Sequence, residues 1–365
     1  MKAMNIKNNI IKALLFGSML FTSIDVSAQY LATNNYYNSL LDDESAVKFR
    51  RGAPRYVHAN KQMHFSPKTT VGEALSYPAF EGFSHLLLPN VKTMDLSVHL
   101  DELQKIMTIH HNVTTQNTLE SLDYIAHEVE EGRQVFFSIY SPEEIKTDPS
   151  LKDCGIFFFR GNKNAPFAVV LPGGYSYRGT IHEGFPVALR IAHEGYNAFV
   201  LTYRKGSLKL GSTDLIRAIN LIRRNYERLN VYPEHYSVWG AAVGAQIAIN
   251  AVQHGYSQKD FSDPLETKPS VNVLSYPLSF YPTRNDVPTV IVVGENDKIV
   301  NKTILKSSIA HLNKLGIESK YISIPRLEHG FGVGFNPSST VSINWIGRAS
   351  SFWEDKAGFD HHVYK

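Results

Sequence analysis

The feature that most constrains this fold is a regular alternation of short apolar runs with helical patterns, which begins near residue 133. Each run is rich in Val, Ile, Leu or aromatic residues and is short enough to be a buried strand. The runs lie at 134–140, 155–160, 167–171, 197–203, 236–239, 271–276, 288–293 and 319–324. Helical patterns separate most of the later runs, at 182–194, 212–229, 244–254 and 302–315. This alternation predicts a mainly parallel central sheet with helices on both faces, and the first two runs are compatible with an antiparallel lead-in.

The chain before residue 133 has a different character. Residues 29–90 are rich in Asn, Tyr, Ser and Pro and show weak periodicity, which predicts irregular structure. Apolar side chains recur at helical spacing in 94–109 and again in 117–131. We therefore expect an N-terminal extension over 29–132, with two amphipathic helices packed on one α/β domain over 133–365.

The first 28 residues show the three-part pattern of a secretory signal peptide. Three lysines form a basic start, an apolar segment follows over 13–24, and Val26-Ser27-Ala28 fits the small-residue cleavage site. The apolar segment is too short to span a bilayer. We expect a secreted or periplasmic protein with no stable membrane insertion after cleavage of residues 1–28.

Composition narrows the class of protein further. A hydrophobic content of 43% with 12% aromatic residues is enough for a sizeable core in a chain of 365 residues. The net charge of +3 includes no long basic run, so the sequence gives no indication of nucleic-acid binding. With Cys154 as the one cysteine, the chain cannot form an intramolecular disulfide.

Two glycine-containing turns follow strand-like runs and suit the binding of an oxyanion. Gly173-Gly174 comes directly after 167–171, where backbone amides can point at a ligand. The stretch YSVWGAAVGAQIA (236–248) leads from an apolar run through Gly-x-x-x-Gly into a helix-compatible segment. That layout is typical of a nucleophile elbow, whose middle residue is usually serine. Here the middle residue is Ala242.

Two further residues complete a recognisable order. Asp297 lies just beyond the run at 288–293, and His329 follows the run at 319–324 in a Gly-rich loop. An aspartate can fix the tautomer of a histidine that acts as general base. Oxyanion loop, elbow, acid and histidine occur here in the chain order of the α/β-hydrolases. Each part alone is weak, but the order and the strand context together predict that fold.

At this point the sequence resembles a known family, the α/β-hydrolase esterases and lipases. More narrowly, it is similar to bacterial hydrolases related to acetylxylan- and feruloyl-esterase-like proteins. The resemblance covers most of the chain after the leader. It rests on GIFFFRG (155–161), PFAVVLPGGYSYRGTIHEGFP (166–186), GYNAFVLTYR (195–204), DLIRAINLI (214–222), YSVWGAAVGAQIA (236–248), GENDKIV (294–300) and HGFGVG (329–334).

The resemblance implies a role for each matching position. Asp297 and His329 match the family's acid and base, and Ala242 stands where the family carries its nucleophilic serine. The backbone positions that match the oxyanion hole are Gly174, Tyr175 and Val243. Gly173, Tyr177 and Phe331 flank the same site and are candidates for substrate contact, although the aromatic side chains could equally serve packing.

Three explanations for Ala242 remain open from the sequence. A serine could have been replaced deliberately to trap substrate. The chain could be a natural pseudoenzyme that kept its pocket for binding. Water activated by His329 and Asp297 could take the place of the missing hydroxyl. In each case the departure puts catalysis in doubt and leaves the fold prediction unchanged.

The functional expectation is a serine-hydrolase-type site for carboxylic esters, with small-molecule or carbohydrate-linked substrates, in a form that is inactive or nearly so. The alternative is a non-catalytic ligand-binding or interaction protein on the same fold. The expected chemistry needs no cofactor, and the sequence shows no metal-ligand spacing.

Overall fold

A computed structural model describes residues 63–88, 94–106, 114–174, 180–334 and 344–358. All of these residues belong to one compact unit, Ser45–Lys365. The predicted signal peptide, Tyr175 and Tyr177 lie outside the described residues. Within the described part of the chain, no helix is both long and apolar enough to cross a membrane.

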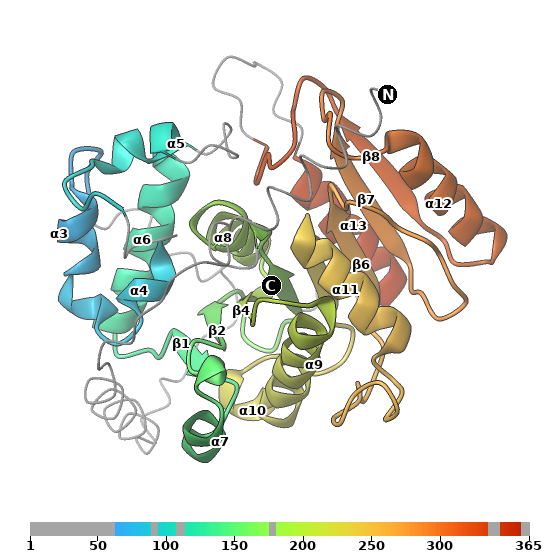
Figure 1. Cartoon of the computed structure of the whole chain (residues 1–365), viewed down its shortest axis with the longest axis horizontal. Helices are drawn as coiled ribbons and strands as arrows, with labels where there is room; N and C mark the ends of the chain where they lie inside the picture. Colours follow the sequence, from blue (N-terminus) through green and yellow to red (C-terminus); the bar gives the residue numbers. More distant parts are fainter. Residues whose placement is uncertain (1–62, 89–93, 107–113, 175–179, 335–343, 359–365) are drawn as a thin grey trace. The chain divides into compact units, whose positions relative to one another are not determined.

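The core of the unit is an eight-stranded sheet with the order β1-β2-β4-β3-β5-β6-β7-β8 (Figure 1). The strands are β1 (Phe136–Ser138), β2 (Gly155–Phe159), β3 (Phe167–Leu171), β4 (Asn197–Thr202), β5 (Ser237–Ala241), β6 (Val271–Ser275), β7 (Thr289–Gly294) and β8 (Lys320–Ile324). Strands β3 to β8 run parallel, whereas β2 pairs antiparallel with both β1 and β4. The mainly parallel central sheet predicted from the sequence is confirmed, and its first two strands form the antiparallel lead-in with which the sequence was compatible.

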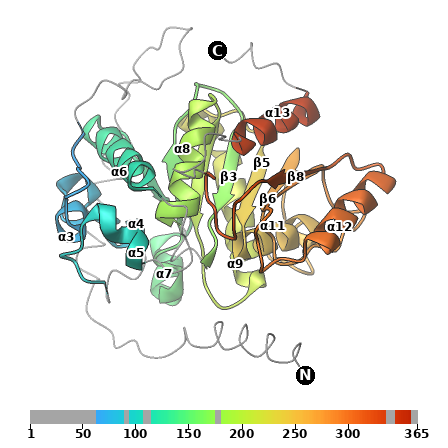
Figure 2. The same cartoon turned by 90° about the horizontal axis from the view of Figure 1, so that it is seen from above.

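Helices cover both faces of the sheet. Their bounds are α8 (Phe185–His193), α9 (Leu208–Arg224), α11 (Val243–His254), α12 (Lys302–Lys314) and α13 (Trp345–Ala357). Helices α8 and α13 contact each other on one face, and α9 contacts α11 on the other (Figure 2). Because both faces are covered, every residue of β2 to β7 is buried, which explains why those strands read as continuous apolar runs.

A buried ion pair fixes the end of β4 to α9. The carboxylate of Asp214, fully buried on α9, accepts hydrogen bonds from the backbone N–H of Arg204 at 2.7 Å and from its Nη2 at 2.7 Å. The hydroxyl of Tyr140 donates to the same carboxylate at 2.5 Å. Since several donors share this buried carboxylate, removal of Asp214 would leave them without their acceptor in the core. The same part of the chain also contains two short helices, α7 (Pro142–Thr147) and α10 (Tyr226–Leu229).

The described part of the N-terminal extension is helical and packs beside the β1–β2 edge. It contains α3 (Val71–Leu75), α4 (Ser84–Leu87), α5 (Leu103–Ile106) and α6 (Thr115–Glu130), of which α6 contacts α8. Phe83 meets the ring of Phe157 edge-on at 5.5 Å, and Tyr124 stacks on Phe159 at 4.9 Å. Aromatic contacts between the extension and β2 thus join the two predicted parts into one core.

One of the two helices predicted in the extension is much shorter than expected. The pattern at 117–131 is α6, but in 94–109 the described residues form only a 3₁₀ turn at Leu100–Glu102 and the short α5. Asp95 caps a turn by accepting from the backbone N–H of Ser97 at 2.9 Å, and His99 pairs with Thr70 in an isolated bridge. These local bonds compete with the helix, and Leu96 is left 46% exposed.

The two glycines around Ala242 allow α11 to start directly against the sheet. A Cβ on Gly244 would lie 2.2 Å from the carbonyl oxygen of Leu171, and one on Gly240 would lie 2.6 Å from the Cα of Ala245. Both distances are far below van der Waals contact, and the nearest neighbours in each case are backbone atoms. Only glycine therefore permits the close approach of β3, β5 and α11 at this turn.

We predict that Gly244→Ala destabilises the fold by about 3 kcal/mol, because the new methyl group must push β3 away from α11. Urea unfolding followed by circular dichroism measures the change. Gly316→Ala is the matched control: its Cβ has open space but its φ is +79°, so we expect a loss of only about 1 kcal/mol. Equal losses in the two variants would contradict the importance of the close approach.

Candidate active site

The elbow holds Ala242 in a backbone conformation that alanine rarely adopts. Ala242 sits between β5 and α11 with φ 48° and ψ −109°. Its backbone N–H donates to the carbonyl oxygen of Ser275 at the end of β6, at 3.0 Å. A strained, non-glycine residue at the strand-to-helix bend is the geometry that a nucleophile elbow requires. Val243 begins α11, where the first amides of a helix lack intrahelical acceptors.

The glycine-rich loop after β3 packs directly against this bend. The backbone N–H of Gly173 donates to Oε2 of Glu183 at 2.7 Å. A Cβ on Gly173 would lie 2.6 Å from that oxygen and 3.3 Å from the Cβ of Ala242. Gly174 follows with φ 61° and is exposed. The loop, the carboxylate of Glu183 and the side chain of Ala242 therefore meet at one point.

Asp297 and His329 form a hydrogen-bonded pair on the same edge of the sheet. Nδ1 of His329 lies 2.8 Å from Oδ2 of Asp297, whose side chain is buried. The other carboxylate oxygen accepts from the backbone N–H groups of Ile299 and Val300 at 2.8 and 3.1 Å. An ionised aspartate only accepts, so Nδ1 carries the proton and Nε2 is left with the lone pair that a general base needs.

The environment of Asp297 favours its charged form. Burial raises the pKa of this carboxyl, but the hydrogen bond and charge of His329 and the two backbone N–H groups act in the opposite direction. The balance leaves the pKa of Asp297 below its usual value. The carboxylate is thus ionised at neutral pH and can hold the imidazole in a single orientation.

Tyr276 connects the two halves of the site. Its hydroxyl donates to Oε1 of Glu183 at 2.7 Å, and its ring lies 4.9 Å from the ring of His329. Tyr276 directly follows β6 and has a φ of 38°. Contacts therefore run from Ala242 through Gly173, Glu183 and Tyr276 to His329. Glu183 and Tyr276 were missed by the sequence analysis, although the position of Tyr276 at the carboxyl end of a strand was a usable signal.

The structure places the predicted site residues in three groups. Ala242 and Val243 follow β5, Asp297 follows β7 and His329 follows β8, while Gly173 and Gly174 follow β3, the neighbour of β5. Tyr175 and Tyr177 lie outside the described residues. Phe331 is fully buried and meets Tyr276 edge-on at 4.7 Å. It therefore supports the Tyr276 ring, which is the packing role that the sequence analysis gave as the alternative for this side chain.

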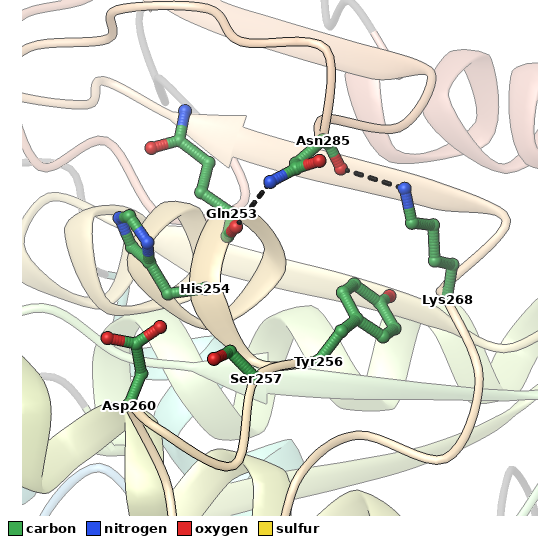
Figure 3. Close-up of a pocket in the computed structure, with 7 residues that line it drawn as sticks. All are labelled: Gln253, His254, Tyr256, Ser257, Asp260, Lys268 and Asn285. Carbon is green, nitrogen blue, oxygen red and sulfur yellow. Dashed lines mark hydrogen bonds between the residues drawn. The ribbon is translucent and has the colours of Figure 1, made fainter.

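A hollow of about 300 Å³ lies elsewhere, at the carboxyl end of α11 (Figure 3). Its lining residues are Gln253, His254, Tyr256, Ser257, Asp260, Lys268 and Asn285. Helix α11 has 12 residues and spans about 18 Å, so its two ends lie at opposite edges of the sheet. The hollow is therefore separate from the site around Ala242.

The sequence of this chain is similar to known proteins over only part of its length. No family model matches the chain. An alignment of 120 residues, which covers 30% of this chain, is 28% identical to endo-1,4-beta-xylanase B of Butyrivibrio fibrisolvens. The match covers only 19% of that protein's length.

Solved structures with similar folds include an acetyl ester-xyloside bifunctional hydrolase from Caldicellulosiruptor lactoaceticus, 22% identical with a TM-score of 0.49 over 61% of this chain and 96% of that one. A thermophilic esterase from Thermogutta terrifontis is 13% identical, with a TM-score of 0.49 over 61% and 92% of the two chains. A carboxylesterase from Lactobacillus plantarum is 16% identical, with a TM-score of 0.48 over 56% and 93%.

We predict that Ala242→Gly stabilises the protein by about 1 kcal/mol, because glycine adopts this positive φ without steric cost. Chemical denaturation measures the difference. Ala241→Gly is the matched control, since Ala241 is buried in ordinary strand conformation and should lose about 1 kcal/mol or more. A loss of stability in Ala242→Gly would show that the bend is not strained.

The Asp297–His329 pair predicts a pH dependence of stability. A carboxyl whose pKa is lowered on folding stabilises the native state above its unfolded pKa of about 4, and the contribution is lost as pH falls through the folded value. The part of the difference in unfolding free energy between the parent and Asp297→Asn that comes from the aspartate charge should therefore be lost as pH falls below about 4. A difference that stays constant down to pH 2.5 would contradict the lowered pKa.

Proposed function

We propose that this chain carries a serine-hydrolase-type site for carboxylic esters in which Ala242 occupies the position of the nucleophile. The observation that supports this most directly is the strained backbone of Ala242, with φ 48° and ψ −109°. Such strain costs about 1–3 kcal/mol and does nothing for an alanine, which adds no reactive group. It is the geometry that a reacting side chain needs at the bend, and it is kept beside a hydrogen-bonded Asp–His pair.

Each part would have a defined role in ester cleavage if a serine stood at 242. Nε2 of His329 would take the hydroxyl proton while the oxygen attacks the ester carbonyl, and Asp297 would stabilise the imidazolium that forms. The amides at Gly174, Tyr175 and Val243 would bind the oxyanion. Collapse of the tetrahedral intermediate releases the alcohol, which takes the proton from His329, and water then hydrolyses the acyl-serine by the same steps.

With alanine at 242 the covalent route is closed. A site of this kind without its nucleophile retains about 10³–10⁴-fold acceleration over water through its oxyanion hole and substrate binding. The present chain should therefore bind an ester and turn it over at no more than a trace rate. The missing hydroxyl also favours the second candidate function, a binding protein that recognises an ester without cleaving it.

We further propose a carbohydrate-linked ester as the ligand and an exported location for the protein. The first is supported by the similarity of 120 residues to part of an endo-1,4-beta-xylanase, an enzyme named for a polysaccharide substrate. The second is supported by the basic, apolar and small-residue segments of residues 1–28.

Restoring the hydroxyl tests the proposal. We expect Ala242→Ser to hydrolyse p-nitrophenyl acetate and acetylated xylo-oligosaccharides at least about 10³-fold faster than the parent, because it supplies the one missing group. His329→Ala in that background should abolish the gain. Ala241→Ser places the same hydroxyl one residue before the bend and should stay at the parent rate.

The outcome separates the two candidate functions. Robust turnover by Ala242→Ser supports the esterase site. If a folded Ala242→Ser protein is inert on both substrates while the parent binds acetylated xylo-oligosaccharides in calorimetry, the site is a binding site. If the parent also fails to bind, the proposal of an ester ligand is wrong.

A further inference from the structure

A second group of polar side chains lies in the N-terminal extension, among residues that the hydrolase-type site does not use. His127 and Glu130 are three residues apart on α6, so they lie on the same face of that helix. His64, from the segment before α3, lies against this face, and its ring centroid is 4.3 Å from that of His127. Two imidazoles and one carboxylate therefore converge from segments far apart in the sequence.

The distances between the three side chains suit a single small cation. Nε2 of His64 is 3.0 Å from Oε2 of Glu130, and Nδ1 of His127 is 3.6 Å from the same oxygen. One ligand atom from each residue lies within 4.8 Å of the others. Tetrahedral Zn²⁺ with bonds of about 2.0–2.1 Å places its ligand atoms about 3.3 Å apart, so small adjustments are enough for binding.

A buried carboxylate holds His64 in the orientation that a metal ligand needs. Oδ1 of Asp123 accepts from the backbone N–H of His64 at 2.6 Å and lies 3.2 Å from its Nδ1. Asp123 is only 5% exposed. A proton on Nδ1 facing Asp123 leaves the lone pair of Nε2 directed at Glu130, and carboxylate–histidine–metal arrangements use this orientation.

Glu130 is held in a similar way. Its Oε1 accepts from the hydroxyl of Tyr77 at 2.5 Å, which leaves Oε2 as the oxygen that both imidazoles face. A lone pair on a neutral imidazole nitrogen repels a carboxylate oxygen at hydrogen-bond distance. A cation placed between the two imidazoles and the carboxylate removes this repulsion, because each of the three groups then binds the cation.

A second acidic and histidine-containing group in the same extension lacks these features. His99, Asp101 and Glu102 also bring ligand atoms together. However, Asp101 is paired with Lys68 at 2.9 Å and Glu102 with Lys105 at 3.0 Å. Lysine ammonium groups already neutralise these carboxylates, so this group is the matched control for the first.

We propose that His64, His127 and Glu130 bind one Zn²⁺ ion, with water in the fourth position. Two imidazoles and a carboxylate form a ligand set that catalytic zinc sites also use, and the three protein ligands leave one position open. Asp123 and Tyr77 position the ligands. The bound ion would join the segment around His64 to α6 and so fix the start of the described extension.

Calorimetric titration of the untagged, chelator-treated full chain with Zn²⁺ tests the proposal. We expect one ion per chain, and binding that is lost in His127→Gln and Glu130→Gln. Asp123→Asn should keep the site but weaken the affinity about 10–100-fold, because it leaves His64 less firmly oriented. His99→Gln should bind as tightly as the parent.

A second measurement covers the case in which a ligand variant fails to fold. Co²⁺ added to the chelator-treated parent should give the intense visible absorption of a tetrahedral site, and Zn²⁺ should displace it. Absence of both Zn²⁺ binding and this spectrum in the parent would overturn the proposal. Zn²⁺ binding that persists unchanged in folded His127→Gln or is lost in His99→Gln would also overturn it.

Discussion

The close contact between α11 and the carboxyl end of β3 is the constraint on which the candidate site depends. It exists because Gly244 has no side chain to separate the helix from the carbonyl oxygens of Leu171 and Pro172. With the helix this near, the glycine-rich loop after β3 must pass over the bend at Ala242. Glu183, just before α8, and Tyr276, just after β6, then extend the contacts from this turn to His329, which follows β8.

Much of the fold could be predicted because its signal is local and repeated. Six strands from β2 to β7 are buried along their whole length, and they appear in the sequence as uninterrupted apolar runs. The prediction failed where short-range polar bonds compete with a helical pattern, as at Asp95 and Ser97. Helix α13 was also missed, although Trp345 and Trp353 are among its fully buried residues.

The site was only partly accessible to sequence reasoning. Asp297 and His329 could be nominated because each follows a strand and their order along the chain is informative. Glu183 could not, because its role comes from two hydrogen bonds to partners on other elements, the amide of Gly173 and the hydroxyl of Tyr276. The group around His64 has the same character, because a long stretch of chain separates His64 from His127 and Glu130 on α6.

The bend at Ala242 separates the architecture of the site from its reactivity. The hydrogen bond between Asp297 and His329, the loop at Gly173 and the backbone of the elbow all form without a hydroxyl at position 242. Alanine and serine codons differ by a single base. A single base change is therefore enough to place a hydroxyl at the bend, while the surrounding hydrogen bonds stay as they are.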